Sequence, residues 1–419
     1  MENAYLYLDS LGLHKIKPGL RRIRKLLESL GNPQKKVPGI IVGGTNGKGS
    51  VVSAISSVLT AEGYKTGAYT SPHLINVTER IKINGKELAS DELARIILRV
   101  KKAGEKSLAE SPSYFEVLTA SAFVYFAEAE ADYSVLEVGM GGRWDATNVI
   151  TPLVSVITNI SKDHTDYLGR TIAEIALEKA CIIKPRVTAV TGAKGKALGV
   201  IAEYASIKRS PLKVYGRDFL SRGDNTGSFD YVGSGWKLER LCSNLAGAYQ
   251  IENLSVAISA LETMSHDHGI RIGEENLRKG LLKIDWGGRL EILRKNPPLI
   301  LDSAHNPGGA KALVKSLARL HPSLKFTFLI GMLGDKDHAS FLRELSPLAE
   351  KLVITEIPSE RAVSAEALSE KASKIFSGEI RTESDYKKAF SDLKKLRRPA
   401  CIAGSLYLTG AIKALLASQ

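Results

Sequence analysis

The chain has 419 residues, about three times the usual length of one domain, so we expect two or three domains. Hydrophobic residues make up 44% and charged residues 25%, which excludes a disordered or fibrous chain. The net charge of +13 favours anionic partners, but aromatic residues are only 6% and no basic arm is present, so nucleic acid is not an expected partner.

The first elements in chain order are a strand, a glycine-rich turn and a helix. The pattern predicts a strand over 38–43, a helix over 48–61 and a further strand over 66–70. Backbone N–H groups of such a turn wrap phosphate oxygens, and a lysine at the helix start neutralises them. We expect ATP to bind here rather than a plain turn, through Gly44, Thr45, Asn46, Gly47, Lys48, Gly49 and Ser50. Gly49 displaces Ser50 from the usual position of the magnesium-binding hydroxyl.

Two candidate metal ligands follow. Ser71 stands where the strand over 66–70 ends, and its hydroxyl could ligate a metal, although a Ser-Pro turn explains it equally well. Glu116 starts the helix predicted over 114–129. Its carboxylate suits Mg²⁺, but with Ser113 it also forms a capping-box pattern. Both interpretations of each residue stay open.

Strands predicted over 133–138, 153–158 and 187–191 extend one large sheet, with a helix over 172–183. Acids follow the first of these strands, where a ligand site and a glycine turn are equally plausible. His164 follows the second strand beside Asp163, which favours a functional role over a structural one. Lys179 in the helix is expected to lie at the surface, although a partly buried lysine would react with carbon dioxide.

A second series of strands is predicted over 298–302, 325–330, 351–356 and 399–403, with helices between them. The segment 284–298 is rich in glycine and proline, which divides the chain into domains 1–286 and 287–419. A cleft between two such domains is a usual ligand site. Polar residues follow two strands of the second series and could face that cleft: Asp302, His305, Ser405 and Tyr407. Asp302 could instead only cap the helix that follows it.

Nothing in the sequence predicts membrane insertion or disulfides. The longest uncharged stretch, residues 146–161, contains Thr, Asn and Pro and is too short for a bilayer span. The N-terminus lacks the basic start and apolar middle of a signal peptide, so we expect a cytoplasmic protein. The three cysteines are Cys181, Cys242 and Cys401. They lie far apart in the sequence and form no CxxC pair, so neither a disulfide framework nor a cysteine zinc site is expected.

Taken together, the order and spacing of these motifs resemble the folylpolyglutamate and dihydrofolate synthases of the Mur ligase superfamily. The matching segments are GTNGKGS, SPH, ERI, YFE, EVGMGGRWDATN, DHTDYLG, EKACIIKP, YQIENL, GRLE, DSAHNPGG and AGSLYLTG. The resemblance implies an α/β fold: a P-loop ATPase domain with a parallel-type sheet, and a smaller Rossmann-like C-terminal domain. It also implies ATP-dependent joining of L-glutamate to a folate or dihydropteroate carboxylate through an acyl phosphate, in a monomer.

The resemblance also implies roles for particular residues. Lys48 would hold the phosphates, Ser71 and Glu116 one Mg²⁺, and Glu116 with His164 a second. Lys179 matches a carbamylated lysine. The nucleotide contacts would be Asn253, Arg289, Asp302 and His305, and the residues near glutamate Ser405 and Tyr407. The chain departs from the family pattern at Trp144, Cys181 and Ser303.

Two alternatives remain from the sequence. A Mur-type ligase with another pair of acid and amino acid would share the phosphate loop, but the SPH, YFE and DHTD segments argue against it. A nucleic-acid-dependent P-loop ATPase is favoured only by the net charge and Lys48.

Overall fold

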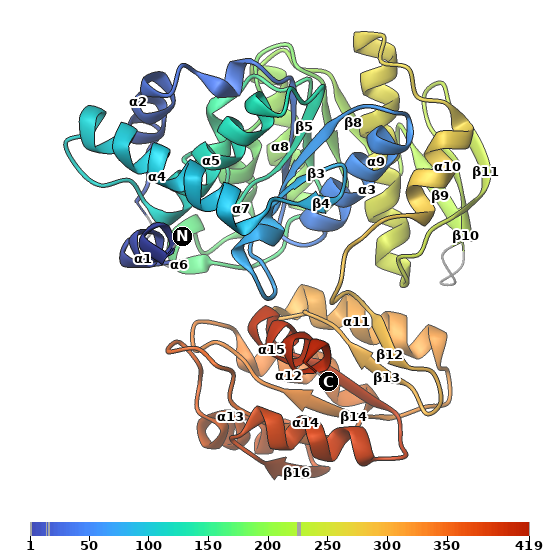
Figure 1. The fold of residues 1–419 in the computed structure, drawn as a ribbon. Helices are drawn as coiled ribbons and strands as arrows, with labels where there is room; N and C mark the ends of the chain where they lie inside the picture. The colour runs from blue at the N-terminus through green and yellow to red at the C-terminus, as the bar shows by residue number, and fades with distance from the viewer. Residues whose placement is uncertain (1, 14, 16, 224–227, 419) are drawn as a thin grey trace.

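The computed structural model describes residues 2–13, 15, 17–223 and 228–418. Figure 1 shows a larger N-terminal part, coloured blue to yellow, and a smaller orange and red C-terminal part joined by a single connecting segment. In the described part of the chain, none of the helices combines the length and apolar character needed to cross a bilayer.

The larger part is built on an eight-stranded sheet. Its strand order is β4-β3-β2-β5-β1-β6-β7-β8. Six neighbouring strands run parallel. At one edge, β3 pairs antiparallel with β2, and β4 pairs antiparallel with β3. In chain order the strands are β1 (Gly39–Gly43), β2 (Thr66–Tyr69), β3 (Ile81–Ile83), β4 (Lys86–Glu87), β5 (Tyr133–Glu137), β6 (Val154–Ile157), β7 (Ala189–Thr191) and β8 (Leu212–Val214). The carboxyl ends of the parallel strands therefore meet at one edge, where α/β sheets bind ligands.

Helices cover both faces of this sheet. Central strand β1 is buried along its whole length, as expected for a parallel strand. Ile40 and Val42 pack with α3 and α9, whereas Ile41 faces the α7 and α8 side. The helices are α1 (Glu2–Ser10), α2 (Arg21–Ser29), α3 (Lys48–Ala61), α4 (Ser90–Ser107), α5 (Tyr114–Glu128), α6 (Thr165–Leu168), α7 (Ile172–Ala180), α8 (Gly195–Ile207), α9 (Ala248–His268) and α10 (Glu274–Leu282).

A second, three-stranded antiparallel sheet was not predicted. It consists of β9 (Leu220–Gly223), β10 (Ser228–Val232) and β11 (Lys237–Cys242). Phe229 and Tyr231 of β10 are buried in the core that also contains α9. The alternating burial along β10 is typical of a strand with one solvated face, a weaker signal than the apolar runs of the large sheet.

The C-terminal part has a six-stranded sheet of order β12-β13-β17-β14-β15-β16. Only the edge strand β12 is antiparallel. Its elements are β12 (Glu291–Arg294), β13 (Leu299–Leu301), α11 (Pro307–Leu320), β14 (Phe326–Ile330), α12 (His338–Leu345), β15 (Ala349–Ile354), α13 (Ala365–Ser373), β16 (Glu379–Thr382), α14 (Tyr386–Lys395), β17 (Ala400–Ala403) and α15 (Leu406–Ala417).

The predicted α/β class with a large and a small sheet is confirmed. The helix over 48–61 has the predicted ends. The strand predicted over 351–356 lies two residues earlier, at Ala349–Ile354, and the helix predicted over 172–183 ends at Ala180. A domain boundary at residue 287 stays a proposal, consistent with β12 being the first strand of the smaller sheet.

Candidate active site

A cavity of about 870 Å³ lies between the two parts. Its walls come from the phosphate loop, the ends of β5 and β6, helix α7, and the C-terminal segments 302–309 and 404–407. All the predicted site residues line it: Gly44, Thr45, Asn46, Gly47, Lys48, Gly49, Ser50, Ser71, Glu116, His164, Lys179, Asn253, Arg289, Asp302, His305, Ser405 and Tyr407. Residues as far apart in sequence as Gly44 and Tyr407 therefore face one space, because parallel strands of each sheet end at the same edge.

The glycines of the phosphate loop are required by close packing. Gly44 and Gly47 have positive φ angles of 134° and 82°. A Cβ at Gly47 would lie 2.3 Å from Asn253 Oδ1. At Gly49 it would lie 2.0 Å from the ring of Trp286, which explains why a residue without a side chain separates Lys48 from Ser50.

Glu137 lies in the strand predicted over 133–138, at whose end the sequence fits a ligand site and a glycine turn equally well. The structure places it in the cavity wall. It ends β5, next to β1 and the phosphate loop. Its Oε2 accepts a hydrogen bond of 3.1 Å from the backbone N–H of Ser71, and its Oε1 lies 3.9 Å from Lys48 Nζ. Burial raises the pKa of the Glu137 carboxyl, while the charge of Lys48 acts in the opposite direction. In the sequence, the only indication of a role for Glu137 is its place at the end of a strand. That place does not distinguish a ligand-binding acid from a residue of a turn.

Glu116 forms the capping box that its sequence also indicated. Its Oε2 accepts from the N–H of Ser113 at 2.7 Å, and Ser113 Oγ accepts from the N–H of Glu116 at 3.2 Å. The same Oε2 pairs with Arg22 Nε at 3.2 Å. The other oxygen, Oε1, is buried without a hydrogen-bond partner in the described chain. Capping thus occupies one oxygen only, and metal binding by Glu116 stays a prediction.

Lys179 corrects the expectation of a surface lysine. Its side chain is buried, and Nζ donates a 2.8 Å hydrogen bond to the carbonyl of Gly44 in the phosphate loop. Burial, together with the nearby charge of Lys48, lowers the pKa of Lys179 to about 7. Near neutral pH a large fraction of this amine is uncharged and nucleophilic.

His164 begins the short helix α6 with a left-handed φ of 51°, which turns the chain sharply after Asp163. Desolvation in the cavity wall lowers the pKa of His164 to about 4, despite the opposing charge of Asp163. A neutral imidazole is the form that binds metal ions. No group of three His, Cys, Asp and Glu side chains in the described ranges is arranged to hold a metal alone.

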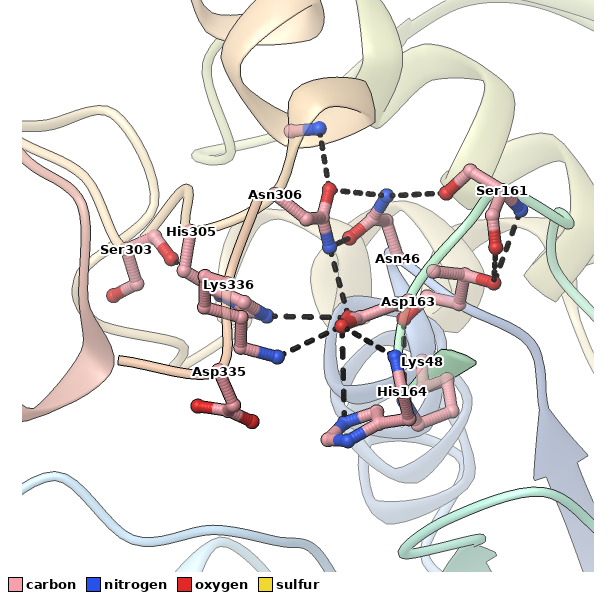
Figure 2. Close-up of polar contacts among 12 residues, drawn as sticks. Asn46, Lys48, Ser161, Asp163, His164, Ser303, His305, Asn306, Asp335 and Lys336 are labelled. Atoms are coloured by element: carbon pink, nitrogen blue, oxygen red, sulfur yellow. Dashed lines mark hydrogen bonds and ion pairs between the residues drawn. The ribbon is translucent and has the colours of Figure 1, made fainter. Parts of the chain in front are cut away.

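Asp163 and Asn306 connect the two parts of the molecule, as Figure 2 shows. Asp163 Oδ1 lies 2.7 Å from Lys336 Nζ, and its Oδ2 lies 3.5 Å from His305 Nε2. Asn306 Nδ2 donates to Asp163 Oδ2 and to Asn46 Oδ1, both at 3.0 Å. The amide of Asn306 therefore ties the C-terminal part to the phosphate loop and to the residue before His164.

We expect Asn306→Ser to loosen this connection. Serine keeps the helix cap, in which Asn306 Oδ1 accepts from the N–H of Gly309, but its hydroxyl is too short for both cross-connections. Loss of two buried hydrogen bonds should lower the free energy of unfolding by about 2 kcal/mol, measured in urea, and raise the radius of gyration in X-ray scattering. The control Asn276→Ser removes one bond to Glu62 inside the larger part. An unchanged radius of gyration in Asn306→Ser would contradict the role of Asn306.

The remaining predicted residues lie around the cavity with partners of their own. Asn253 Nδ2 donates to Gln250 Oε1 at 3.0 Å. Asp302 holds the backbone N–H groups of Leu290 and Ala304, both at 2.8 Å, whereas the cap of α11 is Asn306. Ser405 caps α15, because its Oγ accepts a hydrogen bond of 3.0 Å from the N–H of Tyr407.

Comparisons with known proteins give a consistent result. The model of the Mur ligase middle domain matches residues 42–261, and that of the Mur ligase glutamate ligase domain matches 288–405. The dihydrofolate synthase/folylpolyglutamate synthase of Bacillus subtilis is 35% identical over 413 residues, covering 95% of both chains. Mycobacterium tuberculosis folylpolyglutamate synthase complexed with ADP and AMPPCP superposes with a TM-score of 0.90 at 34% identity, covering 99% of this chain and 97% of that chain. Escherichia coli FolC in complex with DHPP and ADP gives 0.91 at 29% identity, covering 100% and 97%.

Proposed function

The chain belongs to the folylpolyglutamate and dihydrofolate synthase family of Mur ligases, and on that premise we propose that it joins L-glutamate to a folate carboxylate with conversion of ATP to ADP and phosphate. The observation that carries the proposal is the single cavity in which the phosphate loop faces the C-terminal segments. Dihydropteroate is a second acceptor, supported by the double name of the Bacillus subtilis relative.

In the proposed reaction the acceptor carboxylate attacks the γ-phosphorus of ATP and gives an acyl phosphate and ADP. The amine of glutamate then displaces phosphate and forms the amide. The phosphate loop binds the ATP phosphates through its N–H groups, and Lys48 neutralises their charge. The two parts of the molecule hold the acceptor and glutamate close together, which supplies much of the rate enhancement.

Mg²⁺ fits the residues at the phosphate loop, since a hard cation takes oxygen ligands and keeps several waters. When bound, it would neutralise charge on the transferring phosphoryl group. We propose that Ser71 and Glu137 hold it, because both line the cavity at the phosphate loop and the backbone N–H of Ser71 donates to the Glu137 carboxylate. The buried Glu116 Oε1 keeps Glu116 a candidate, with His164 for a second ion.

Lys179 is proposed to be carbamylated by carbon dioxide, and its carbamate would add negative charge beside the phosphate loop. The nucleotide contacts are proposed to come from Asn253, Arg289, Asp302 and His305, and the contacts to incoming glutamate from Ser405 and Tyr407. We also propose a cytoplasmic monomer.

Phosphate release from ATP, measured with glutamate and with product masses, tests the proposal. The three arms contain no acceptor, dihydropteroate or tetrahydrofolate. We expect a glutamyl mass increment on tetrahydrofolate, and an increment on dihydropteroate as well would establish both synthase activities. Phosphate release that is equal in all arms, without any increment, would contradict the proposed substrate. A Mur ligase with a different acid and amino acid would behave in that way.

A further inference from the structure

Arg80 is a buried cation that the proposed reaction does not yet use. It precedes β3, and only 3% of its surface is exposed. Its Nε donates a 3.0 Å hydrogen bond to His73 Nδ1, and its guanidinium carbon lies 5.5 Å from the centre of the Tyr114 ring. No Asp or Glu oxygen in the described ranges lies within ion-pair distance of Arg80.

The partner of Arg80 carries no compensating charge. His73 Nδ1 accepts the hydrogen bond, so this nitrogen has no proton of its own. The imidazole therefore offers Arg80 a lone pair and no negative charge. A buried charge without an opposite partner is costly, whereas a carboxylate placed on the free edge of a guanidinium makes two parallel charge-assisted bonds.

The free edge of the Arg80 guanidinium is accessible to a ligand, because Arg80 lines a cavity. Arg80 and Tyr407 line both the main cavity and a smaller one of about 490 Å³, so Arg80 stands where the two meet. The loop before it also carries Ser71, which contacts Glu137 at the phosphate loop. On the other side, helix α15 packs so closely that a Cβ at Gly410 would lie 1.9 Å from the carbonyl oxygen of Leu74.

Resting on the proposed function, we propose that Arg80 binds a carboxylate of a substrate between the phosphate loop and the start of α15. Two sources share this chemistry: the incoming glutamate, and the carboxylate of the folate acceptor that does not react. The guanidinium would fix the orientation of that acid relative to the reacting groups, and the protein's own structure leaves this charge without an acidic partner.

Arg80→Met and Arg80→Lys test the assignment. Wild-type protein and variants are compared by titration calorimetry with L-glutamate and with tetrahydrofolate in the presence of ADP and Mg²⁺, and by the KM for each acid. We expect the dissociation constant and KM of one acid to rise about tenfold to a hundredfold, with ADP affinity unchanged. A change for glutamate alone identifies glutamate as the source, and a change for tetrahydrofolate alone identifies the acceptor. Lysine should restore little, because it lacks the two-pronged geometry.

Arg294→Lys is the matched control. Arg294 is a half-buried arginine outside both cavities, and each of its three guanidinium nitrogens donates to a backbone carbonyl, those of Pro297, Lys394 and Leu396. The Arg294→Lys variant should have a lower melting temperature than the wild-type protein and an unchanged KM for both acids. Arg80→Met should keep or raise the melting temperature, because it removes an unpaired buried charge.

The outcomes separate this inference from the proposed function. Unchanged binding of both acids by the Arg80 variants would overturn the inference, and so would a wild-type protein that binds neither acid. Binding that depends on Arg80 in a protein without ligase activity would support the inference and contradict the proposed function.

Discussion

Replacing Lys179 by alanine is expected to lower the rate of glutamate ligation about a hundredfold while the fold stays intact, as for other residues that organise a metal site. The amine lies in the cavity wall against the carbonyl of Gly44, and its pKa of about 7 makes it available for reaction with carbon dioxide. Since the ammonium form does not react, activity should rise with pH through about 7 and should depend on bicarbonate. The rates are measured by phosphate release at saturating substrates.

Lys184→Ala is the control for this prediction. Lys184 also donates to a backbone carbonyl, that of Asn148 at 3.0 Å, and burial lowers its pKa to about 8, but it lies outside the cavity. Its loss should leave ligation near the wild-type rate. With ¹³C-bicarbonate, a carbamate carbon signal should appear in wild-type protein and be absent from Lys179→Ala. Wild-type activity in Lys179→Ala would refute the carbamate role.

Glu137→Gln is expected to lower the turnover number by about a hundredfold to a thousandfold, the range for loss of one electrostatic contact to the transition state. Glutamine has the same size and can still accept a hydrogen bond from the N–H of Ser71, so the loop should keep its shape. The lost negative charge would weaken Mg²⁺ binding, and the Mg²⁺ concentration for half-maximal activity should rise. The variant is compared with wild-type protein over a Mg²⁺ titration.

Glu116→Gln separates the two candidate carboxylates. Glutamine also serves in a capping box, so α5 should remain folded. If Glu137 is the main ligand, the Mg²⁺ requirement of Glu116→Gln should change much less than that of Glu137→Gln. A larger change in Glu116→Gln would instead support the ligand set that the family resemblance implies.

The sequence determined the parts of the fold that depend on local patterns. The apolar run at 39–43, the glycine-rich turn and the helix that begins at Lys48 predicted the strand, loop and helix that the structure contains. Their physical basis is local: parallel strands are buried on both faces, and a phosphate loop needs glycines. The antiparallel strands β9 to β11 were missed because their polar outer faces weaken the apolar signal.

The chemical environment of four residues depends on contacts between segments far apart in the chain: Lys179, Glu116, Glu137 and Arg80. The sequence predicts a surface position for Lys179, because the residues of its helix do not indicate that the phosphate loop packs over this side chain. In the sequence, Glu137 and Glu116 are both acids beside a helix or a turn. In the structure, only Glu137 contacts Ser71 and lies near Lys48. The guanidinium of Arg80 contacts His73 and Tyr114, neither of which is acidic, and only the folded structure shows these contacts.

The phosphate loop, the α/β class and the family were thus predictable from the sequence, because each depends on residues close together in the chain or on motifs in a fixed order. The tertiary structure decided burial, charge pairing and pKa, as in the link from Asn46 through Asn306 to Asp163. These properties depend on distances between residues that are remote in sequence, and local patterns carry no information about such distances.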